Sequence, residues 1–178
     1  MGESPDEGSL LMIDQLTVCL PDGPGKLAAM CHLLGEKSIQ IHALMVAETV
    51  DFGIIRVICD KPRATAQMLR ERGYNAMCAR VVAAEVENVP GALGHLLDRL
   101  ASCDLNVEYA YTCSMGDRTV DVIKATGEPL EIKLRESGLA FLEAKDLYEV
   151  GTVARVIQIL RASNSMMRVV MEGGSRAR

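Results

Sequence analysis

The chain carries the run Asp22-Gly23-Pro24-Gly25-Lys26-Leu27, and a related run begins 66 residues later (Pro24 to Pro90), Asn88-Val89-Pro90-Gly91-Ala92-Leu93. Both runs lead into apolar residues at helical spacing: Leu27, Met30, Cys31 and Leu34, then Leu93, Leu96, Leu97 and Leu100. Such an internal repeat predicts one supersecondary unit used twice. The offset falls to 65 at Leu69 and Leu134, so we predict a one-residue deletion opposite residues 46–53, in a hairpin loop.

Each copy is predicted to fold as strand, helix, strand, strand, helix and strand, with the last strand of the second copy at 141–150. This order is the ferredoxin-like pattern of an α+β fold. We therefore expect two βαββαβ units side by side, forming one continuous antiparallel sheet of eight strands with the helices on one face. No linker separates the copies, because the strand-like run 79–86 leads directly into the second Pro-Gly pair.

The predicted boundaries follow from the repeat. Residues 1–12 form a disordered lead-in, 13–82 the first unit and 83–150 the second unit. In the segment 151–172, a stripe at Val153, Val156, Ile157 and Leu160 predicts a helix capped by Thr152, followed by a short strand at 166–171. Residues 173–178 are predicted to be a flexible tail.

Composition excludes several classes of function. The net charge of −5 provides no basic footprint for nucleic acid, and aromatic residues are only 3% of the chain, too few for base stacking. Apolar runs fall short of the ~20 residues that span a membrane. The six cysteines show no C-x-x-C spacing, which favours free thiols in the cytoplasm. The sequence holds no nucleotide-binding or catalytic motif, so we predict no catalytic residue, no metal, no cofactor and no enzymatic activity.

Together, a strand, an Asp/Asn-x-Pro-Gly turn, an amphipathic helix and a hydrophobic-Asn-hydrophobic strand start resemble the ACT domain. The second copy fits well, through Asn88-Val89-Pro90-Gly91 and Leu105-Asn106-Val107, and the first has Asp22 and Gln40 at the two polar positions. The resemblance covers residues 13–150 in two copies. It implies a regulatory protein that binds a free amino acid between paired modules, acts on an enzyme of metabolism, and assembles as a homodimer.

The resemblance also implies where the ligand binds: the turn of one module faces the second strand of its partner. The turn residues are Asp22, Gly23, Pro24, Gly25, Lys26, Asn88, Val89, Pro90, Gly91 and Ala92, and the strand residues are Gln40, His42 and Asn106. Residues 88–92 are expected to face Gln40, and residues 22–26 to face Asn106. The residue chemistry agrees, since a helix N-terminus suits a carboxylate and an amide side chain can both donate and accept.

Other interpretations stay open at this point. Asp22 and Asn88 are also good helix caps, and the charge of Asp22 disfavours a carboxylate beside it. Gln40 and Asn106 fit a solvent-facing strand, and His42 fits a surface histidine. The alternative function is an assembly subunit of a metabolic enzyme with no ligand of its own. The sequence does not say which amino acid would bind or which partner is regulated.

Overall fold

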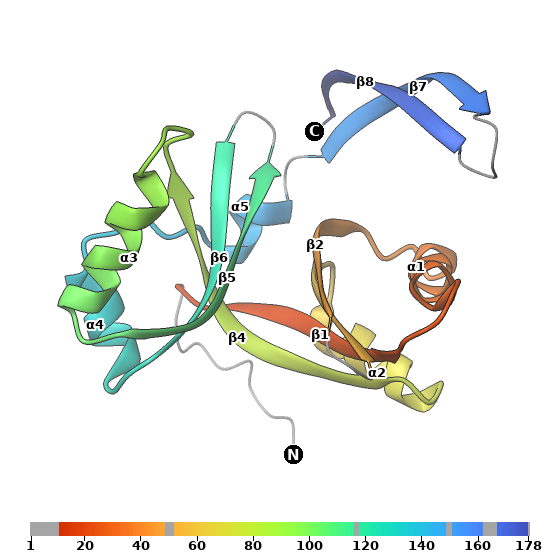
Figure 1. The fold of residues 1–178 in the computed structure, drawn as a ribbon. Coiled ribbons are helices and arrows are strands. Elements are labelled where there is room, and N and C mark those ends of the chain that lie inside the picture. The colour runs from red at the N-terminus through yellow and green to blue at the C-terminus, as the bar shows by residue number, and fades with distance from the viewer. Residues whose placement is uncertain (1–10, 49–51, 116–117, 149–150, 162–166, 178) are drawn as a thin grey trace.

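The computed structural model of the chain describes residues 11–48, 52–115, 118–148, 151–161 and 167–177 (Figure 1). The first unit follows the predicted order. Its elements are β1 (Ile13–Pro21), α1 (Lys26–Glu36), β2 (Ile41–Glu48), β3 (Phe52–Cys59), α2 (Pro62–Glu71) and β4 (Asn75–Val86). Pro62 stands at the first helical position of α2, where its missing N–H costs nothing.

The second unit reuses the end of β4 and repeats most of the pattern. Its further elements are α3 (Ala92–Ser102), β5 (Asn106–Met115), β6 (Arg118–Thr126) and α4 (Leu130–Glu136). All neighbouring strands are antiparallel, and they form one six-stranded sheet in the order β2-β3-β1-β4-β6-β5. The prediction of an α+β fold with two units on a continuous antiparallel sheet is confirmed.

Strand β4 shows why the helices α1 to α4 share one face of the sheet. Successive side chains of a strand point to opposite faces. On one face, Ala76 joins the core under the helices of the first unit, and Val82 and Ala84 join the core under those of the second. On the other face, Val81 and Ala83 pack in a third, central cluster. The alternation runs through β4 without a break, so the sheet keeps the same side toward its helices.

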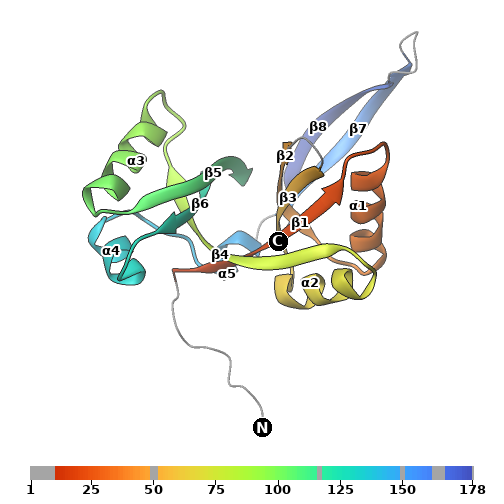
Figure 2. The ribbon, with the colours of Figure 1, turned by 60° about the horizontal axis from the view of Figure 1, so that its bottom comes forward.

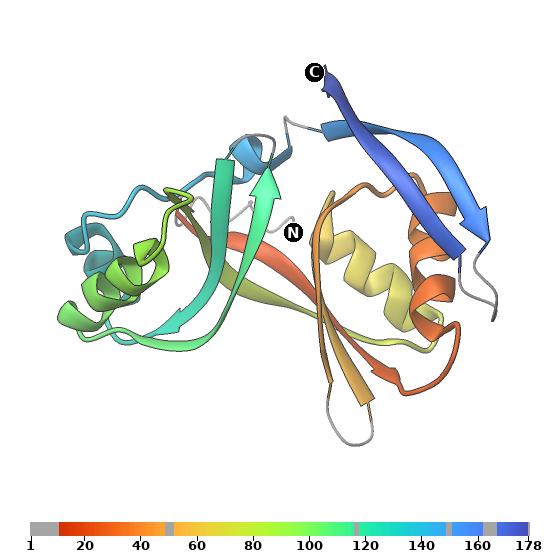
Figure 3. The same cartoon turned by 45° about the horizontal axis from the view of Figure 1, so that its top comes forward.

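The sheet is strongly bent, and the helix pairs therefore lie on the two outer sides of the molecule (Figure 2). The central cluster lies on the sheet face opposite to α1 to α4. It contains residues of both units and of α5 (Ala144–Tyr148), among them Ile13, Ile58, Val122 and Leu147. The two edge strands, β2 and β5, come into contact on this side of the sheet (Figure 3). The units thus share one strand and one core.

The one-residue difference between the copies is not where we predicted it. Val18 pairs with Ile55 in the first unit, and Ala84 pairs with Asp121 in the second, so the offset is still 66 after the hairpin. The offset becomes 65 only at the buried helix residues Leu69 and Leu134. The deletion therefore lies between the third strand and the second helix, where α4 is shorter than α2. The deletion was misplaced because apolar residues are frequent in the third strand of both copies. The two strands therefore match almost as well when one is shifted by one residue.

The predicted eighth strand, at 141–150, is wrong. Phe141 forms only an isolated bridge with Ala84, supported by the bond from the Leu142 amide to the Ala83 carbonyl (2.8 Å), and the chain then enters α5. Residues 149 and 150 lie outside the described part of the chain. The expected eight strands become six because β4 serves both units and the last strand of the second unit is reduced to this bridge. Leu142 and Leu147 instead bury their side chains in the central cluster.

The C-terminal segment also differs from the prediction. Where we expected a helix, a short strand and a tail, the structure has a hairpin of β7 (Gly151–Arg161) and β8 (Met167–Ala177). Figure 1 shows it apart from the six-stranded sheet. The segment is rich in β-branched residues, at Val153, Val156, Ile157 and Ile159, which favour strands. A helical stripe and a strand pattern overlap in such short apolar runs.

Two of the predicted domain boundaries differ from the structure. Residues 1–10 of the expected lead-in lie outside the described part of the chain, whereas Leu11 and Met12 pack against the core of the second unit. The expected boundary between residues 82 and 83 falls inside β4. The units are therefore joined by a continuous strand rather than by a loop.

Candidate functional site

The two Pro-Gly bends, defined as residues 22–25 and residues 88–91, have the same backbone shape. Gly25 (φ 79°) and Gly91 (φ 91°) are left-handed residues immediately before α1 and α3. Each begins its helix with its carbonyl, which accepts from the Ala29 amide at 2.9 Å and from the His95 amide at 3.1 Å. Glycine is needed at both positions because other residues adopt this conformation at a cost.

The bends leave their helix N-termini open. Neither helix has a side-chain cap, so Asp22 and Asn88 do not cap them as the alternative interpretation required. Both bends are largely exposed, as is Lys26 in the first turn of α1. Amide groups at the start of a helix, together with the partial positive charge there, favour an anion.

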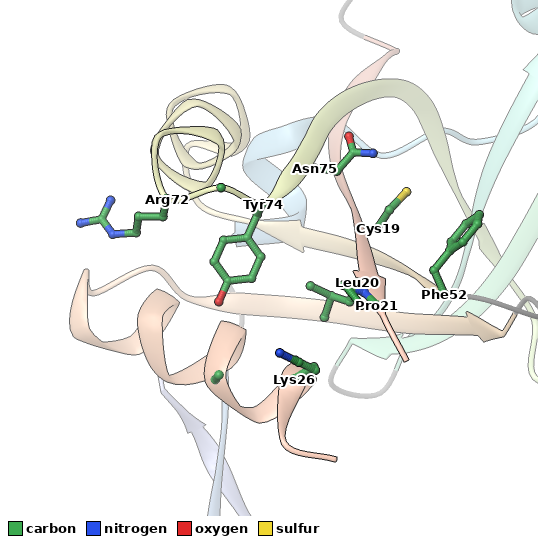
Figure 4. A pocket seen from close by; sticks show the side chains of 10 residues that line it. Cys19, Leu20, Pro21, Lys26, Phe52, Arg72, Tyr74 and Asn75 are labelled. Carbon is green, nitrogen blue, oxygen red and sulfur yellow. The ribbon is translucent and has the colours of Figure 1, made fainter. Parts of the chain in front are cut away.

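A first pocket, of about 570 Å³, lies beside the first bend (Figure 4). It is bounded by the end of β1, the first turn of α1, the start of β3 and the turn between α2 and β4. Its lining is Cys19, Leu20, Pro21, Lys26, Ala29, Phe52, Arg72, Gly73, Tyr74 and Asn75. In Figure 4 the ammonium end of Lys26 and the hydroxyl of Tyr74 point toward the same space, next to Leu20. The lining combines apolar side chains with polar ones, among them the cations Lys26 and Arg72, and none of these ten residues is acidic.

A second pocket, of about 430 Å³, occupies the corresponding place in the second unit. It is lined by Glu85, Val86, Glu87, Asn88, Arg118, Thr119 and Ala140. Residues 85, 86, 87 and 118 lie 66 positions after residues 19, 20, 21 and 52 of the first pocket, so the two hollows are repeat-related. Their chemistry differs, because the second contains two glutamates and an Arg118–Glu85 ion pair (3.6 Å).

The predicted strand residues lie elsewhere. The backbone N–H of Gln40 donates to one carboxylate oxygen of Asp60 at 3.1 Å, and His42 Nε2 lies 2.8 Å from the other carboxylate oxygen. The hydrogen bond from His42 is the main reason why the pKa of Asp60 is lowered. The His42 side chain is only 7% exposed, so the surface-histidine interpretation is wrong. Asn106 begins β5 opposite Thr126 and is exposed.

Of the predicted residues, the first pocket takes in Lys26 and the second takes in Asn88. Gln40, His42 and Asn106 line neither pocket. Phe52, Tyr74 and Arg118 also line the pockets, although they were not predicted as site residues. The repeat could have indicated Phe52 and Arg118 as equivalent, but the misplaced deletion put them out of register. Tyr74 reaches the pocket from a turn distant in sequence, for which no local signal exists.

Two negative findings apply to the part of the chain that the structure describes. No three His, Cys, Asp or Glu side chains gather there as a metal site would require. None of the described helices is both long enough and apolar enough to cross a membrane.

Comparison with known proteins gives a consistent result. A family profile described as an ACT domain pair matches residues 11–151. Protein BT0572 from Bacteroides thetaiotaomicron superposes with a TM-score of 0.70 at 30% identity, over 78% of this chain and 97% of that protein. The ligand-free regulatory subunit of aspartate kinase from Thermus thermophilus superposes with a TM-score of 0.54 at 19% identity, over 73% of this chain and 92% of that subunit. The regulatory subunit of aspartate kinase from Thermus flavus superposes with a TM-score of 0.51 at 18% identity, again over 73% of this chain and 92% of that subunit. No protein with a curated description matches the chain.

The fold and the paired bends define a class of protein built from two fused ferredoxin-like modules. Within that class the chain belongs to the ACT domain family, as an ACT domain pair. The resemblance inferred from the Pro-Gly turns is thereby confirmed. ACT domains are regulatory modules, which gives the chain a regulatory role.

Proposed function

We propose that the chain is a non-enzymatic regulatory protein of the cytoplasm, and that it binds a free amino acid in the first pocket. The observation that carries this proposal is the position of that pocket, at the open N-terminus of α1 and beside the ammonium group of Lys26. A carboxylate placed there gains the helix N–H groups and a cation together.

The rest of the lining supports a small amphipathic ligand. Leu20, Pro21 and Phe52 offer apolar surface for a side chain, and Asn75 and the Tyr74 hydroxyl can donate and accept. A few polar groups that converge on an apolar hollow are typical of small-molecule sites. The second pocket is less suited to a carboxylate, because Glu85 and Glu87 line it and Ala92 stands where the first unit has Lys26.

We further propose that the protein is a homodimer and that Gln40, His42 and Asn106 contribute across the interface. Among the described strands, β2 and β5 are edge strands, each with a hydrogen-bonded neighbour on one side only. Edge strands present unpaired backbone groups that another chain can extend. In such a dimer, each bend would meet the second strand of an opposite unit, as the family resemblance implies. Binding would then alter the packing between chains and the action on a partner enzyme.

The test is thermal unfolding of the wild-type protein with each of the twenty amino acids. A ligand that binds only the folded state stabilises it by about 2.7 kcal/mol at a hundredfold excess over Kd. We expect one amino acid, or a few of similar shape, to raise the melting temperature. Lys26→Met, which keeps the aliphatic stem, should weaken binding about tenfold, the loss of one charge-assisted hydrogen bond. Arg118→Met in the second pocket is the matched control and should leave binding unchanged. A flat response to all twenty contradicts the proposal.

A second candidate is an assembly subunit whose pockets stay empty. The open edges of β2 and β5 favour it, because they could hold a partner enzyme without any ligand. Co-purification with one stoichiometric enzyme, unaffected by all twenty amino acids, would support this candidate over the first.

A further inference from the structure

A partly buried polar cluster connects the two units on the sheet face opposite to α1 to α4. Gln15 of β1 is fully buried, and its side-chain amide donates to the Tyr109 hydroxyl at 2.8 Å and to Thr17 at 3.2 Å. Its carbonyl oxygen accepts from the Tyr111 hydroxyl at 2.9 Å. Burial raises the pKa of Tyr111, which keeps that hydroxyl protonated as a donor. Since both tyrosines belong to β5, one side chain of the first unit holds the edge strand of the second.

Arg56 of β3 completes the cluster but is not fully satisfied. Its guanidinium carbon lies 3.7 Å from the centre of the Tyr109 ring. Its Nε group is buried and finds no acceptor among the residues that the structure describes. Stacking a cation on an aromatic ring is favourable, whereas burying an unpaired donor is unfavourable, and the two effects are similar in size.

We propose that the cluster of Gln15, Arg56, Tyr109 and Tyr111 is a conformational joint with two states of similar free energy. In the first state Arg56 lies on Tyr109 and Gln15 holds β5, as in this structure. In the second state the guanidinium leaves the ring and reaches water, and β5 moves away from the first unit. The Gln15 bonds favour the first state and the unpaired Nε group favours the second. The joint therefore responds to small changes in the strands that carry it.

Those strands also form the first pocket. Cys19 and Leu20 of β1 line it, and so does Phe52 at the start of β3. Thr17, which is bonded to Gln15, lies two residues before Cys19 on the same face of β1. A ligand that shifts the ends of β1 and β3 would change the balance at the joint. This coupling rests on the proposed function, whereas the two-state joint does not.

The test of the joint uses two methionine substitutions and no ligand. Gln15→Met leaves both tyrosine hydroxyls without their partner, so we expect the melting temperature to fall by ~4–8 °C. Arg56→Met keeps an apolar contact with the Tyr109 ring and removes the unpaired donor, so we expect a rise of ~2–4 °C. Amide hydrogen exchange of β5 should follow the same signs, faster in Gln15→Met and slower in Arg56→Met.

Arg135→Met, on the exposed face of α4, is the control for loss of an arginine and should shift neither measurement. If Gln15→Met does not fold, Tyr111→Phe removes one hydroxyl and should give a smaller fall of the same sign. The proposal is overturned if Arg56→Met lowers the melting temperature or speeds exchange of β5. It is equally overturned if both methionine variants behave as the wild type does.

The coupling is tested by repeating the exchange measurement with each amino acid that raises the melting temperature, at about ten times its Kd. We expect the amino acid that raises the melting temperature to change exchange of β5 in the wild type, and to change it less in Arg56→Met. Binding without any change at β5 overturns the coupling. If no amino acid binds, the proposed function fails, and the ligand-free pair of variants still decides whether the joint exists.

Discussion

The two units of this chain have the same backbone and different pockets. Gly25 and Gly91 adopt the same left-handed conformation and start equivalent helices. Around them, the first pocket has Lys26 and Phe52 where the second unit has Ala92 and Arg118. The glycines are constrained because the bend itself requires them. The lining side chains face open space, so they can differ without any change of fold.

A second difference lies in the cores. Ile55 of the first unit is 2% exposed and packs under the helices. Asp121 stands at the same place in the second unit and is 1% exposed. The Thr112 hydroxyl donates to one of its oxygens at 2.5 Å, while the other finds no donor among the described residues. The second unit therefore carries an unfavourable group that the first unit lacks, and exchanging these residues tests the equivalence of the two positions.

The largest effect is expected for Ile55→Asp. It places an unpaired carboxylate in an apolar core, where no residue takes the place that Thr112 has beside Asp121. We expect a loss of ~4 kcal/mol or more in the free energy of unfolding, measured with urea. Val46→Asp, on the neighbouring strand and 49% exposed, is the control and should cost little. A loss at position 55 as small as that of the control would contradict the burial of Ile55 in an apolar core.

The reverse exchange, Asp121→Ile, should stabilise the protein. It removes the unpaired oxygen, and Thr112, which is exposed, can turn its hydroxyl to water. Ala84 beside it is smaller than Val18 beside Ile55, which leaves room for the larger side chain. We expect a gain of ~1–3 kcal/mol in the same urea experiment. A clear loss would show that Asp121 has a partner in solution.

Substituting alanine for each left-handed glycine distinguishes the effect of the bend on stability from its effect on amino-acid binding. Both Gly25→Ala and Gly91→Ala should cost ~1–2 kcal/mol, because the backbone angle and not the available space opposes a Cβ. Only Gly25→Ala should also weaken amino-acid binding, since only the first bend borders the proposed ligand. Calorimetric titration of both variants gives the two affinities, and equal losses of affinity would remove the distinction between the pockets.

The smallest effect concerns pH and again belongs to the first unit. His42 lowers the pKa of Asp60 below its ordinary value of 3.8, and the second unit has Glu108 and Thr126 at these places. A carboxylate with a lowered pKa stabilises the fold above its ordinary value, and the stabilisation is lost as pH falls through the lowered value. His42→Gln should therefore flatten the fall in melting temperature below about pH 4. An unchanged acid profile would rule out this pair as its source.

Much of the fold was predictable because it follows from local patterns. The paired Pro-Gly turns and the apolar stripe after each one predicted two helices, and the structure has both, at Lys26–Glu36 and Ala92–Ser102. The failures occurred where local patterns are ambiguous. The apolar run after Thr152 fits both a helix and a strand, and the segment at 141–150 follows the shape of the central core rather than its own pattern.

The site was less predictable than the fold for a physical reason. Its lining comes from separate elements, so that Tyr74, Phe52 and Lys26 meet only after the unit has folded. The partners of His42 and Gln15 are likewise distant in sequence, at Asp60 and Tyr109. A sequence can indicate an open helix N-terminus through its glycine, but it does not show which side chains will surround that end.

The proposed function depends on the first pocket as the amino-acid site, and calorimetric titration tests this most directly. Wild type, Lys26→Met and Arg118→Met are titrated with the amino acid that raises the melting temperature most. We predict one molecule bound per chain in the wild type and in Arg118→Met, and much weaker binding in Lys26→Met. The absence of binding by the wild type, or equal affinities in the two variants, would contradict the proposed function.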